Sequence, residues 1–220
     1  METIKILNLY ACLGGNRYKW NEISENIHVT AVELDKSLCD LYAQRFPNDT
    51  VINEDAHEFL LKHFKEFDFI WSSPPCPSHS RARYARKETT AATYPDLKLY
   101  EEIIFLQTHF EGKFCVENVI PYYEPLIYAQ KRGRHLYWTN FILPINLNER
   151  KNSIMESKNE ISKWREFHNY DFKKYKGEQR IDKIARNLVD YEAGKTIFET
   201  FFNLHTNQTK QVGLFETLNF

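Results

Sequence analysis

Short runs of apolar residues alternate with amphipathic stretches through the first two thirds of the chain. The apolar runs are rich in β-branched and aromatic residues, which predicts buried strands. These runs lie at residues 4–9, 28–32, 50–53, 67–71, 113–116 and 135–141. The stretches with apolar residues at helical spacing lie at residues 16–25, 36–46, 55–64, 96–110 and 181–202, the last as one helix or two.

This alternation of strand and helix patterns predicts an α/β fold with a parallel, doubly wound sheet. Helices are expected on both faces, because each parallel neighbour needs a crossover connection. Residues 145–181 break the rhythm and are polar, charged and aromatic. We therefore divide the chain into a core at residues 1–144, a small segment at 145–181 and C-terminal helices at 182–220 that return to the core.

Composition narrows the class of protein. The chain has 220 residues, of which 42% are hydrophobic and 15% aromatic, so it can bury a substantial core. Its net charge of −1 gives no overall basic field, and a polyanion must meet a local patch. The four cysteines form no CxxC pair, so we expect neither a metal site nor a disulfide framework. Without a signal-peptide pattern or a long apolar run, we expect a soluble, cytoplasmic protein with no membrane partner.

One cysteine stands directly after a predicted strand. Cys76 follows Pro74-Pro75 and precedes Pro77, at the edge of the sheet where ligands collect in α/β folds. The prolines fix the backbone and cannot continue a strand, so the turn holds the thiol in place. A buried cysteine is often only a small hydrophobic residue, which is the alternative to a nucleophile here.

Three other predicted strand ends carry the features of a nucleoside site. Gly14-Gly15 follows the first strand, where glycine lets a cofactor approach the backbone. Glu33 ends the second strand about 20 residues on, where an acidic residue commonly accepts from ribose hydroxyls. Asp55 follows the third and can either cap a helix or accept from an adenine amino group.

A carboxylate, Glu117, follows the strand at residues 113–116 and can face Cys76 from the same edge. A thiol and a carboxylate without an obvious histidine base suit attack on a ring carbon, with the acid at a ring nitrogen. His79 is the alternative base, although a histidine so close to a turn is more often held there by the turn itself.

In this order the motifs resemble those of the cytosine-5 DNA methyltransferase family. The segments that carry the resemblance are Leu9-Tyr10-Ala11-Cys12-Leu13-Gly14-Gly15, Glu33-Leu34-Asp35, Asp55, Pro75-Cys76 with the later Ser80, Glu117-Asn118-Val119, Gln130-Lys131-Arg132-Gly133-Arg134 and Arg186-Asn187-Leu188-Val189. Together they cover residues 4–144 and about 182–202. The resemblance implies a Rossmann-like methyltransferase sheet with a very small target-recognition segment.

The resemblance also assigns roles. It implies that S-adenosylmethionine contacts Tyr10, Ala11, Cys12, Leu13, Gly14, Gly15, Glu33, Leu34, Asp55, Ala56, Pro75, Asn187 and Val189. It implies that the catalytic residues are Cys76, Glu117, Arg132, Arg134 and Ser80. The chain departs from the pattern at Cys12, where the family usually has glycine, at Asn16, where it has an aromatic residue, and at Pro77, where it has glutamine.

The implied reaction begins when the Cys76 thiolate adds to C6 of cytosine, which makes C5 nucleophilic. Glu117 contacts N3 and the exocyclic amine, and Arg134 with Arg132 meets O2 and a nearby phosphate. C5 then takes the methyl group, and loss of its proton and of Cys76 completes the turnover. We expect nearby arginines to lower the pKa of Cys76.

Double-stranded DNA is the expected partner, and its target base must be flipped out of the stack. Four cations follow Cys76 closely and predict a loop that grips phosphates, namely Arg81, Arg83, Arg86 and Lys87. Lys173 and Lys174, with the aromatics near Trp164, are candidates for sequence readout. The alternative is that these aromatics pack in the core. So short a segment predicts a short or relaxed target sequence, or else a second subunit or a homodimer that completes recognition.

Two other functions remain open from the sequence. The short recognition segment also suits a tRNA cytosine-5 methyltransferase of the same fold. Cys12 and Asn16 suit a catalytically silent regulatory subunit, whereas the intact Cys76, Glu117 and Arg134 favour an enzyme, either orphan or part of a restriction-modification pair.

Overall fold

The computed structural model describes residues 3–85, 88–89, 91–150, 154 and 159–217, with backbone alone for residues 82–83 and 208–217. Seven strands form one sheet in the order β3-β2-β1-β4-β5-β7-β6. The strands are β1 (Ile4–Leu9), β2 (Ile27–Val32), β3 (Thr50–Ile52), β4 (Phe69–Ser72), β5 (Lys113–Val119), β6 (Gln130–Arg132) and β7 (His135–Thr139).

The first five strands are parallel, and β7 and β6 close the edge as an antiparallel hairpin beside β5. The expected doubly wound, Rossmann-like methyltransferase fold is confirmed, with this antiparallel edge and the unpredicted strand β6 as additions. Strand order reverses between β1 and β4, and the carboxyl ends of such strands open a crevice there.

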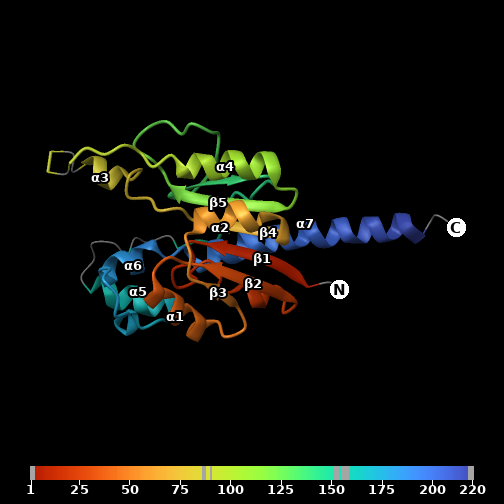
Figure 1. Ribbon diagram of the computed structural model, residues 1–220, viewed down its shortest axis with the longest axis horizontal. Helices are drawn as coiled ribbons and strands as arrows, with labels where there is room; N and C mark the ends of the chain where they lie inside the picture. The colour runs from red at the N-terminus through yellow and green to blue at the C-terminus, as the bar shows by residue number, and fades with distance from the viewer. Residues whose placement is uncertain (1–2, 86–87, 90, 151–153, 155–158, 218–220) are drawn as a thin grey trace.

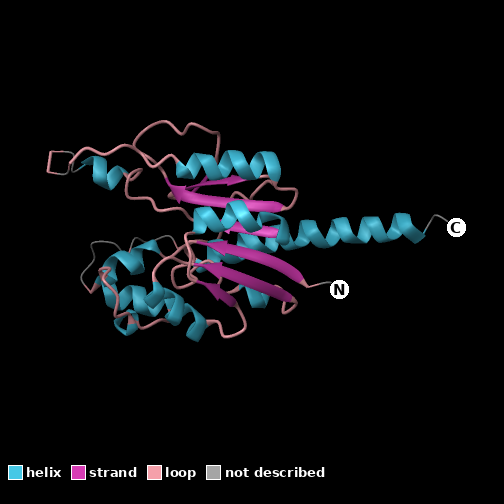
Figure 2. Cartoon of the chain, in the orientation of Figure 1, coloured by secondary structure: helices cyan, strands magenta, loops and turns pink. Residues whose placement is uncertain are grey.

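Helices cover both faces of the sheet (Figures 1 and 2). They are α1 (Lys36–Arg45), α2 (Ala56–His63), α3 (Arg81–Ala85), α4 (Lys98–His109), α5 (Glu160–His168), α6 (Ile181–Asn187) and α7 (Tyr191–Thr217). Alternation of side chains along the strands builds two cores. Ile70 and Phe114 pack with α2 and α4 on one face, while Phe69 packs with Trp20 and α7 on the other.

Two aspartates begin helices at the carboxyl edge, of which Asp55 was expected from the sequence as a possible cap. The Asp35 carboxylate accepts hydrogen bonds from the backbone amides of Ser37 and Leu38 and caps α1. Asp55 accepts from the amide of Glu58 and caps α2. Such caps satisfy backbone donors that have no partner inside the helix.

The prediction of a helix at residues 16–25 is wrong. The chain forms turns there and one 3-10 helix, Trp20–Glu22. Long-range packing explains the difference, since a Cβ on Gly194 of α7 would lie 2.3 Å from the Asn16 carbonyl oxygen. The Trp20 ring stacks on Phe198, also from α7. These contacts hold the segment in a conformation that its local sequence does not dictate.

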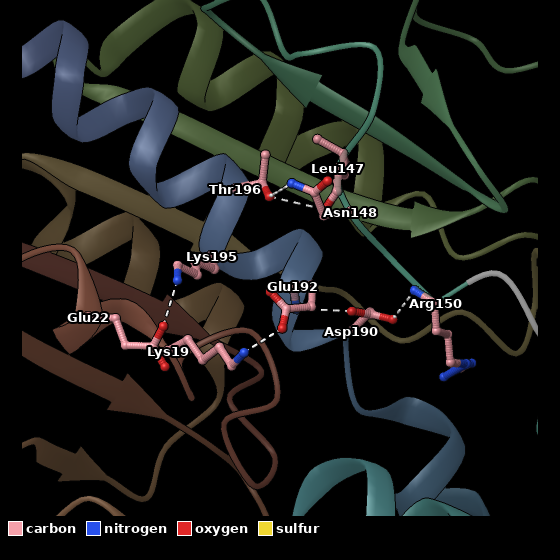
Figure 3. A network of polar contacts seen from close by, with 9 residues as sticks. All are labelled: Lys19, Glu22, Leu147, Asn148, Arg150, Asp190, Glu192, Lys195 and Thr196. Carbon is pink, nitrogen blue, oxygen red and sulfur yellow. Dashed lines mark hydrogen bonds and ion pairs between the residues drawn. The ribbon is translucent and has the colours of Figure 1, made fainter.

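Polar contacts fasten the first turns of α7 to two distant segments (Figure 3). On one side, Lys19 pairs with Glu192, and Lys195 pairs with Glu22 at 2.6 Å. On the other side, the Thr196 hydroxyl donates to the carbonyl of Leu147 at 3.1 Å. Beyond its packed part, α7 extends away from the sheet on the side opposite the strands' carboxyl ends (Figure 1).

Residues 145–181 pack their aromatic side chains into a third core. Trp164, Phe172 and Tyr175 are buried against Leu38 and Leu41 of α1 and against α6. Of the two alternatives for these aromatics, the structure has them in a core rather than on a free surface. Within the described part of the chain, no helix combines the length and apolar character that spanning a bilayer requires.

Candidate active site

A cleft of about 740 Å³ opens at the carboxyl edge of the sheet. It is lined by the ends of β1, β2, β4 and β5, by the start of α2, and by residues 177–189. Helix α3 stands on one side of this edge and α5 and α6 on the other (Figure 1). The predicted site residues that line it are Tyr10, Ala11, Cys12, Gly15, Glu33, Leu34, Asp55, Ala56, Pro75, Cys76, Glu117, Asn187 and Val189. Thus the chain brings most of the predicted cofactor residues and two catalytic candidates together in one cavity.

Two residues expected at the cofactor face elsewhere. Leu13 is fully buried in the core between α1 and the 145–181 segment. Gly14 packs against α1, where an added Cβ would lie 2.4 Å from the ring of Phe46. Its φ of +67° also lies in the left-handed region that favours glycine. Both residues therefore shape the turn and do not line the cleft.

The turn after β1 is strained where the chain departs from the family pattern. Cys12 has a φ of +48°, in the region where glycine is favoured and other residues are uncommon. The turn also approaches α6–α7 closely, since a Cβ on Gly15 would lie 2.5 Å from the Val189 carbonyl oxygen. The cysteine therefore adopts the backbone conformation of the glycine that it replaces.

Glu33 bridges the first two strand ends. One carboxylate oxygen accepts from the amide of Cys12 and the other from the amide of Asp35, both at 2.9 Å. Burial raises the pKa of Glu33, and these two hydrogen bonds oppose the rise. Each oxygen of a carboxylate has a further lone pair, which leaves acceptor capacity for a hydroxyl in the cleft.

Asp35 is a cleft residue whose tie to the 172–181 segment the sequence did not reveal. Besides capping α1, its carboxylate accepts from the Tyr175 hydroxyl at 2.6 Å and the Gln179 amide at 2.9 Å. Gly177 and Gln179 line the cleft. These hydrogen bonds hold residues 175–179 at the rim of the cavity. The pairing spans 140 residues, so no local pattern could have predicted it.

Cys76 lies partly buried on the cleft wall, directly beyond the proline turn that follows β4. Burial, and secondarily the charge of Glu117, raises its pKa to about 11. Lys183 of α6 acts in the opposite direction, and it also lines the cleft. The expectation that arginines lower this pKa is therefore wrong, because the nearby cation is a lysine and burial dominates.

The two arginines of the Gln-x-Arg-x-Arg segment lie outside this cleft. Arg132 donates to the backbone carbonyls of Leu143 at 2.8 Å and Pro144 at 2.6 Å, which ties the edge hairpin to the following loop. Arg134 is exposed and lines an adjoining pocket with Glu149. Neither arginine lines the cleft that holds Cys76 and Glu117 in this conformation, so their expected contacts with O2 and a phosphate stay a prediction.

Glu117 instead faces a histidine that the sequence reasoning missed. His135 begins β7, and its Nε2 lies 3.6 Å from Oε1 of the buried Glu117 carboxylate. Both residues line the cleft with Cys76. The adjacent Asn118 donates from Nδ2 to the carbonyl of Pro74 at 3.0 Å, which joins the end of β5 to the Cys76 turn. The thiol and the carboxylate are thereby held on one rigid edge.

His79 is buried and lies on the cleft wall. Its Nδ1 is 2.6 Å from the Tyr123 hydroxyl, and burial lowers its pKa. The amides of His79 and Ser80 both donate to the carbonyl of Cys76. Ser80 also forms a β-bridge with Pro121 and does not line the cleft. These contacts order the turn around the thiol.

The predicted nucleic-acid residues lie on two surfaces. Arg81 of α3 is exposed, and its Nε donates to the carbonyl of Pro121 at 3.0 Å. The side chain of Arg83, together with Arg86 and Lys87, lies outside the described part of the chain. Lys173 and Lys174 are exposed on a 3-10 helix, Phe172–Lys174, whose Phe172 is buried. The two lysines therefore lie beside the α1–α6 core.

A family model described as C-5 cytosine-specific DNA methylase matches residues 4–121, more than half of the chain. Its match includes the β1 turn, Glu33, Asp55, Cys76 and Glu117. No curated protein matches the chain.

Three solved structures give likenesses at low identity. A DNMT2 mutant from Spodoptera frugiperda is 23% identical with a TM-score of 0.38, covering 53% of this chain and 35% of that one. A putative DNA modification methyltransferase encoded within an E. coli prophage is 20% identical with a TM-score of 0.37, covering 55% and 33%. The methyltransferase EhMeth from Entamoeba histolytica is 13% identical with a TM-score of 0.42, covering 70% and 59%. The chain thus spans about a third of the length of the first two. On the match to the family model, the chain belongs to the C-5 cytosine-specific DNA methylase family.

Proposed function

We propose that this chain transfers a methyl group from S-adenosylmethionine to C5 of a cytosine in double-stranded DNA, through a covalent bond to Cys76. The observation that carries the proposal is the single cleft that holds Cys76 and Glu117 together with Glu33 and Asp55. A nucleophile and an acid at one end of a cavity, with ribose and adenine acceptors at the other, fit both reactants of this transfer.

The residues at the far end fit the cofactor. Glu33 has acceptor capacity for the ribose hydroxyls, and Asp55 lies at the start of α2 on the same wall. Ala11, Cys12 and Gly15 of the β1 turn line the cavity, where their backbone groups can meet the ligand. When bound, the cofactor supplies an electrophilic methyl group on a sulfonium.

At the near end, the Cys76 thiolate forms a bond to C6 of the flipped cytosine, and Glu117 shares a proton with N3. The electron pair released toward C5 would then form the bond to the methyl carbon, as the bond from that carbon to the sulfonium sulfur breaks and the cofactor leaves as a thioether. A base removes the C5 proton, the C5–C6 double bond re-forms, and Cys76 leaves as thiolate. Flipping the base costs roughly a few kcal/mol, which contacts along the nucleic acid must offset.

Glu117 couples the protonation states of the site. Its negative charge is the second cause of the raised pKa of Cys76. When Glu117 carries the proton that it shares with N3, that charge is removed and the thiolate becomes easier to form. Lys183 remains as the favourable cation. Binding of the target cytosine therefore helps to form the Cys76 thiolate that attacks it.

His135 is the residue that we assign to positioning Glu117. It contacts the carboxylate from β7 and lines the same cavity. Arg132 is tied to backbone carbonyls outside the cleft, so we assign this role to the imidazole.

The test is methyl transfer from labelled S-adenosylmethionine to mixed-sequence duplex DNA, with tRNA and Cys76→Ser as parallel arms. Label in DNA that disappears with Cys76→Ser supports the proposal, and sequencing the product for 5-methylcytosine gives the target. Label in tRNA alone would replace DNA by RNA as acceptor. Label in neither acceptor, with cofactor still bound, would indicate the silent subunit.

One observation favours the RNA alternative. The segment at residues 145–181 is small, and its aromatics Trp164, Phe172 and Tyr175 are buried, so these three side chains are not available to read a duplex. A second subunit or a homodimer that completes recognition would account for the same observation with DNA as acceptor.

A further inference from the structure

We propose that Tyr84 and Tyr122 form a stacking platform for a nucleobase next to the target cytosine. The two rings are parallel, with centroids 5.1 Å apart and planes within 5° of each other. They remain 50% and 36% exposed. The inference rests on the proposed function, because it takes a nucleic acid as the methyl acceptor.

The platform is joined to the turn that holds the nucleophile. The Tyr122 amide donates to the carbonyl of His79 at 3.1 Å, and the His79 amide donates to the carbonyl of Cys76 at 3.0 Å. Tyr122 also packs edge-on against Tyr123, whose hydroxyl lies 2.6 Å from His79 Nδ1. The stacked rings are therefore set at a fixed position relative to the thiol by main-chain and side-chain contacts.

Two separate elements supply the rings. Tyr84 belongs to α3, the helix that follows Cys76 in the chain. Tyr122 belongs to the loop after β5, and β5 is the strand that carries Glu117. The bridge between Ser80 and Pro121 holds these elements together. The platform thus joins the segment that follows Cys76 to the segment that follows strand β5.

A nucleobase is the expected ligand of this platform because of what base flipping does to the bases beside the target cytosine. Removal of the target base takes a stacking partner from its neighbours, and an aromatic face can replace that partner. Arg81 is exposed on α3 three residues before Tyr84, with its Nε fixed to the Pro121 carbonyl. Aromatic faces with a cation at the same edge are the combination that binds unstacked bases and their backbone.

The first measurement is photocross-linking of mixed-sequence duplex DNA that carries 5-iodouracil in place of thymine, followed by peptide mapping. We expect cross-links in peptides that contain Tyr84 or Tyr122, and their loss in Tyr84→Ala and Tyr122→Ala. Cross-links confined to other peptides would overturn the platform.

The second measurement is DNA affinity by fluorescence anisotropy. Each alanine variant should bind roughly tenfold more weakly, the size of a lost base–aromatic stack, whereas Tyr84→Phe should bind as the wild type does. Tyr128→Ala is the matched control, since Tyr128 is 90% exposed and belongs to the segment before β6. Unchanged affinity of both alanine variants would overturn the inference.

Methyl transfer measured in parallel separates this inference from the proposed function. If the wild type methylates DNA, and the alanine variants of Tyr84 and Tyr122 methylate DNA at the same rate and bind it with the same affinity, the platform is refuted and the proposed function is not. Cross-links at Tyr84 or Tyr122 without methyl transfer support the platform and refute the proposed activity. Absence of binding to DNA and to RNA would overturn both.

Discussion

Glu117 and His135 are diagonal neighbours on one face of the β5–β7 pair, with 3.6 Å between the carboxylate and the imidazole. Strand register fixes this relationship, because Glu117 pairs with Tyr137 and Val119 pairs with His135. Diagonal neighbours on one face of an antiparallel pair are within reach of long side chains. The cavity that holds Cys76 is on the same edge, so this contact orients the acid of the proposed reaction.

The first prediction concerns His135. Replacing it with phenylalanine removes the partner of a buried carboxylate, and we expect kcat for methyl transfer to fall roughly tenfold with little change in KM for the cofactor. His135→Gln keeps a donor and should recover much of that loss.

A thermal melt separates positioning from general damage to the fold, because it confirms that both His135 variants are folded. If folded His135→Phe transferred methyl groups at the wild-type rate, His135 would have no part in positioning Glu117.

The second prediction concerns the reactivity of Cys76. With a pKa raised to about 11, the thiol is mostly protonated at neutral pH. Alkylation by iodoacetamide, followed by mass spectrometry of the Cys76 peptide, should accelerate about tenfold per pH unit as the thiolate fraction grows. Glu117→Gln should raise the rate at a fixed pH by roughly threefold to tenfold, because one cause of the raised pKa is removed. Equal rates in both proteins would show that the two groups are not coupled.

The third prediction concerns Glu33. Alanine here removes the proposed acceptor for the cofactor hydroxyls and also the partner of the Cys12 and Asp35 amides. We expect S-adenosylmethionine affinity to fall by about a hundredfold or more, because two hydrogen bonds to a charged group are worth about 3 kcal/mol or more. Isothermal calorimetry measures the affinity, and a thermal melt confirms that the variant is folded. An affinity equal to that of the wild type would place the ribose elsewhere.

The fourth prediction concerns a buried carboxylate beneath the cleft. Glu102 of α4 accepts from the Tyr10 hydroxyl at 2.5 Å and the Ser72 hydroxyl at 2.6 Å, and contacts His57 at 3.1 Å. These partners come from the turn after β1, from the end of β4 and from α2. Glu102→Ala should therefore lower the free energy of unfolding by about 3 kcal/mol, since it leaves buried donors without a partner.

The same cluster predicts a pH dependence of stability. The hydrogen bond to Glu102 raises the pKa of His57 above its ordinary value of 6.5. A pKa raised on folding gives stability that is complete below that ordinary value and is lost as pH rises through the folded pKa. In urea titrations, the wild type should exceed His57→Gln by more at about pH 5.5 than at about pH 8.5. The difference should stay under about 1 kcal/mol, because His57 is partly exposed.

Local signals account for the parts of the fold and site that the sequence predicts. The strands, the cap at Asp55 and the proline turn at Cys76 depend on residues a few positions apart. Since carboxyl ends of parallel strands meet at one edge, these signals were enough to bring Glu33, Cys76 and Glu117 into one cleft.

The contacts that the sequence did not predict are made between distant segments. His135 reaches Glu117 only through the hairpin that β6 and β7 form at the sheet edge, and Gly133 adopts a φ of +50° in its turn. Arg132 is held by carbonyls of residues 143 and 144. The Cys76 pKa depends on burial, which no linear motif encodes.

The last prediction tests which of the two cationic surfaces contacts nucleic acid. Each phosphate contact contributes about 0.9 to the slope of log affinity against log salt concentration. Replacing Arg81, Arg83 and Arg86 with glutamine should therefore reduce that slope by about 2 to 3. Lys173→Gln with Lys174→Gln is the control at the α1–α6 surface, and its slope should stay close to that of the wild type. A reduced slope in the lysine variant with no change in the arginine variant would move the nucleic acid from the Cys76 loop to the segment at residues 145–181.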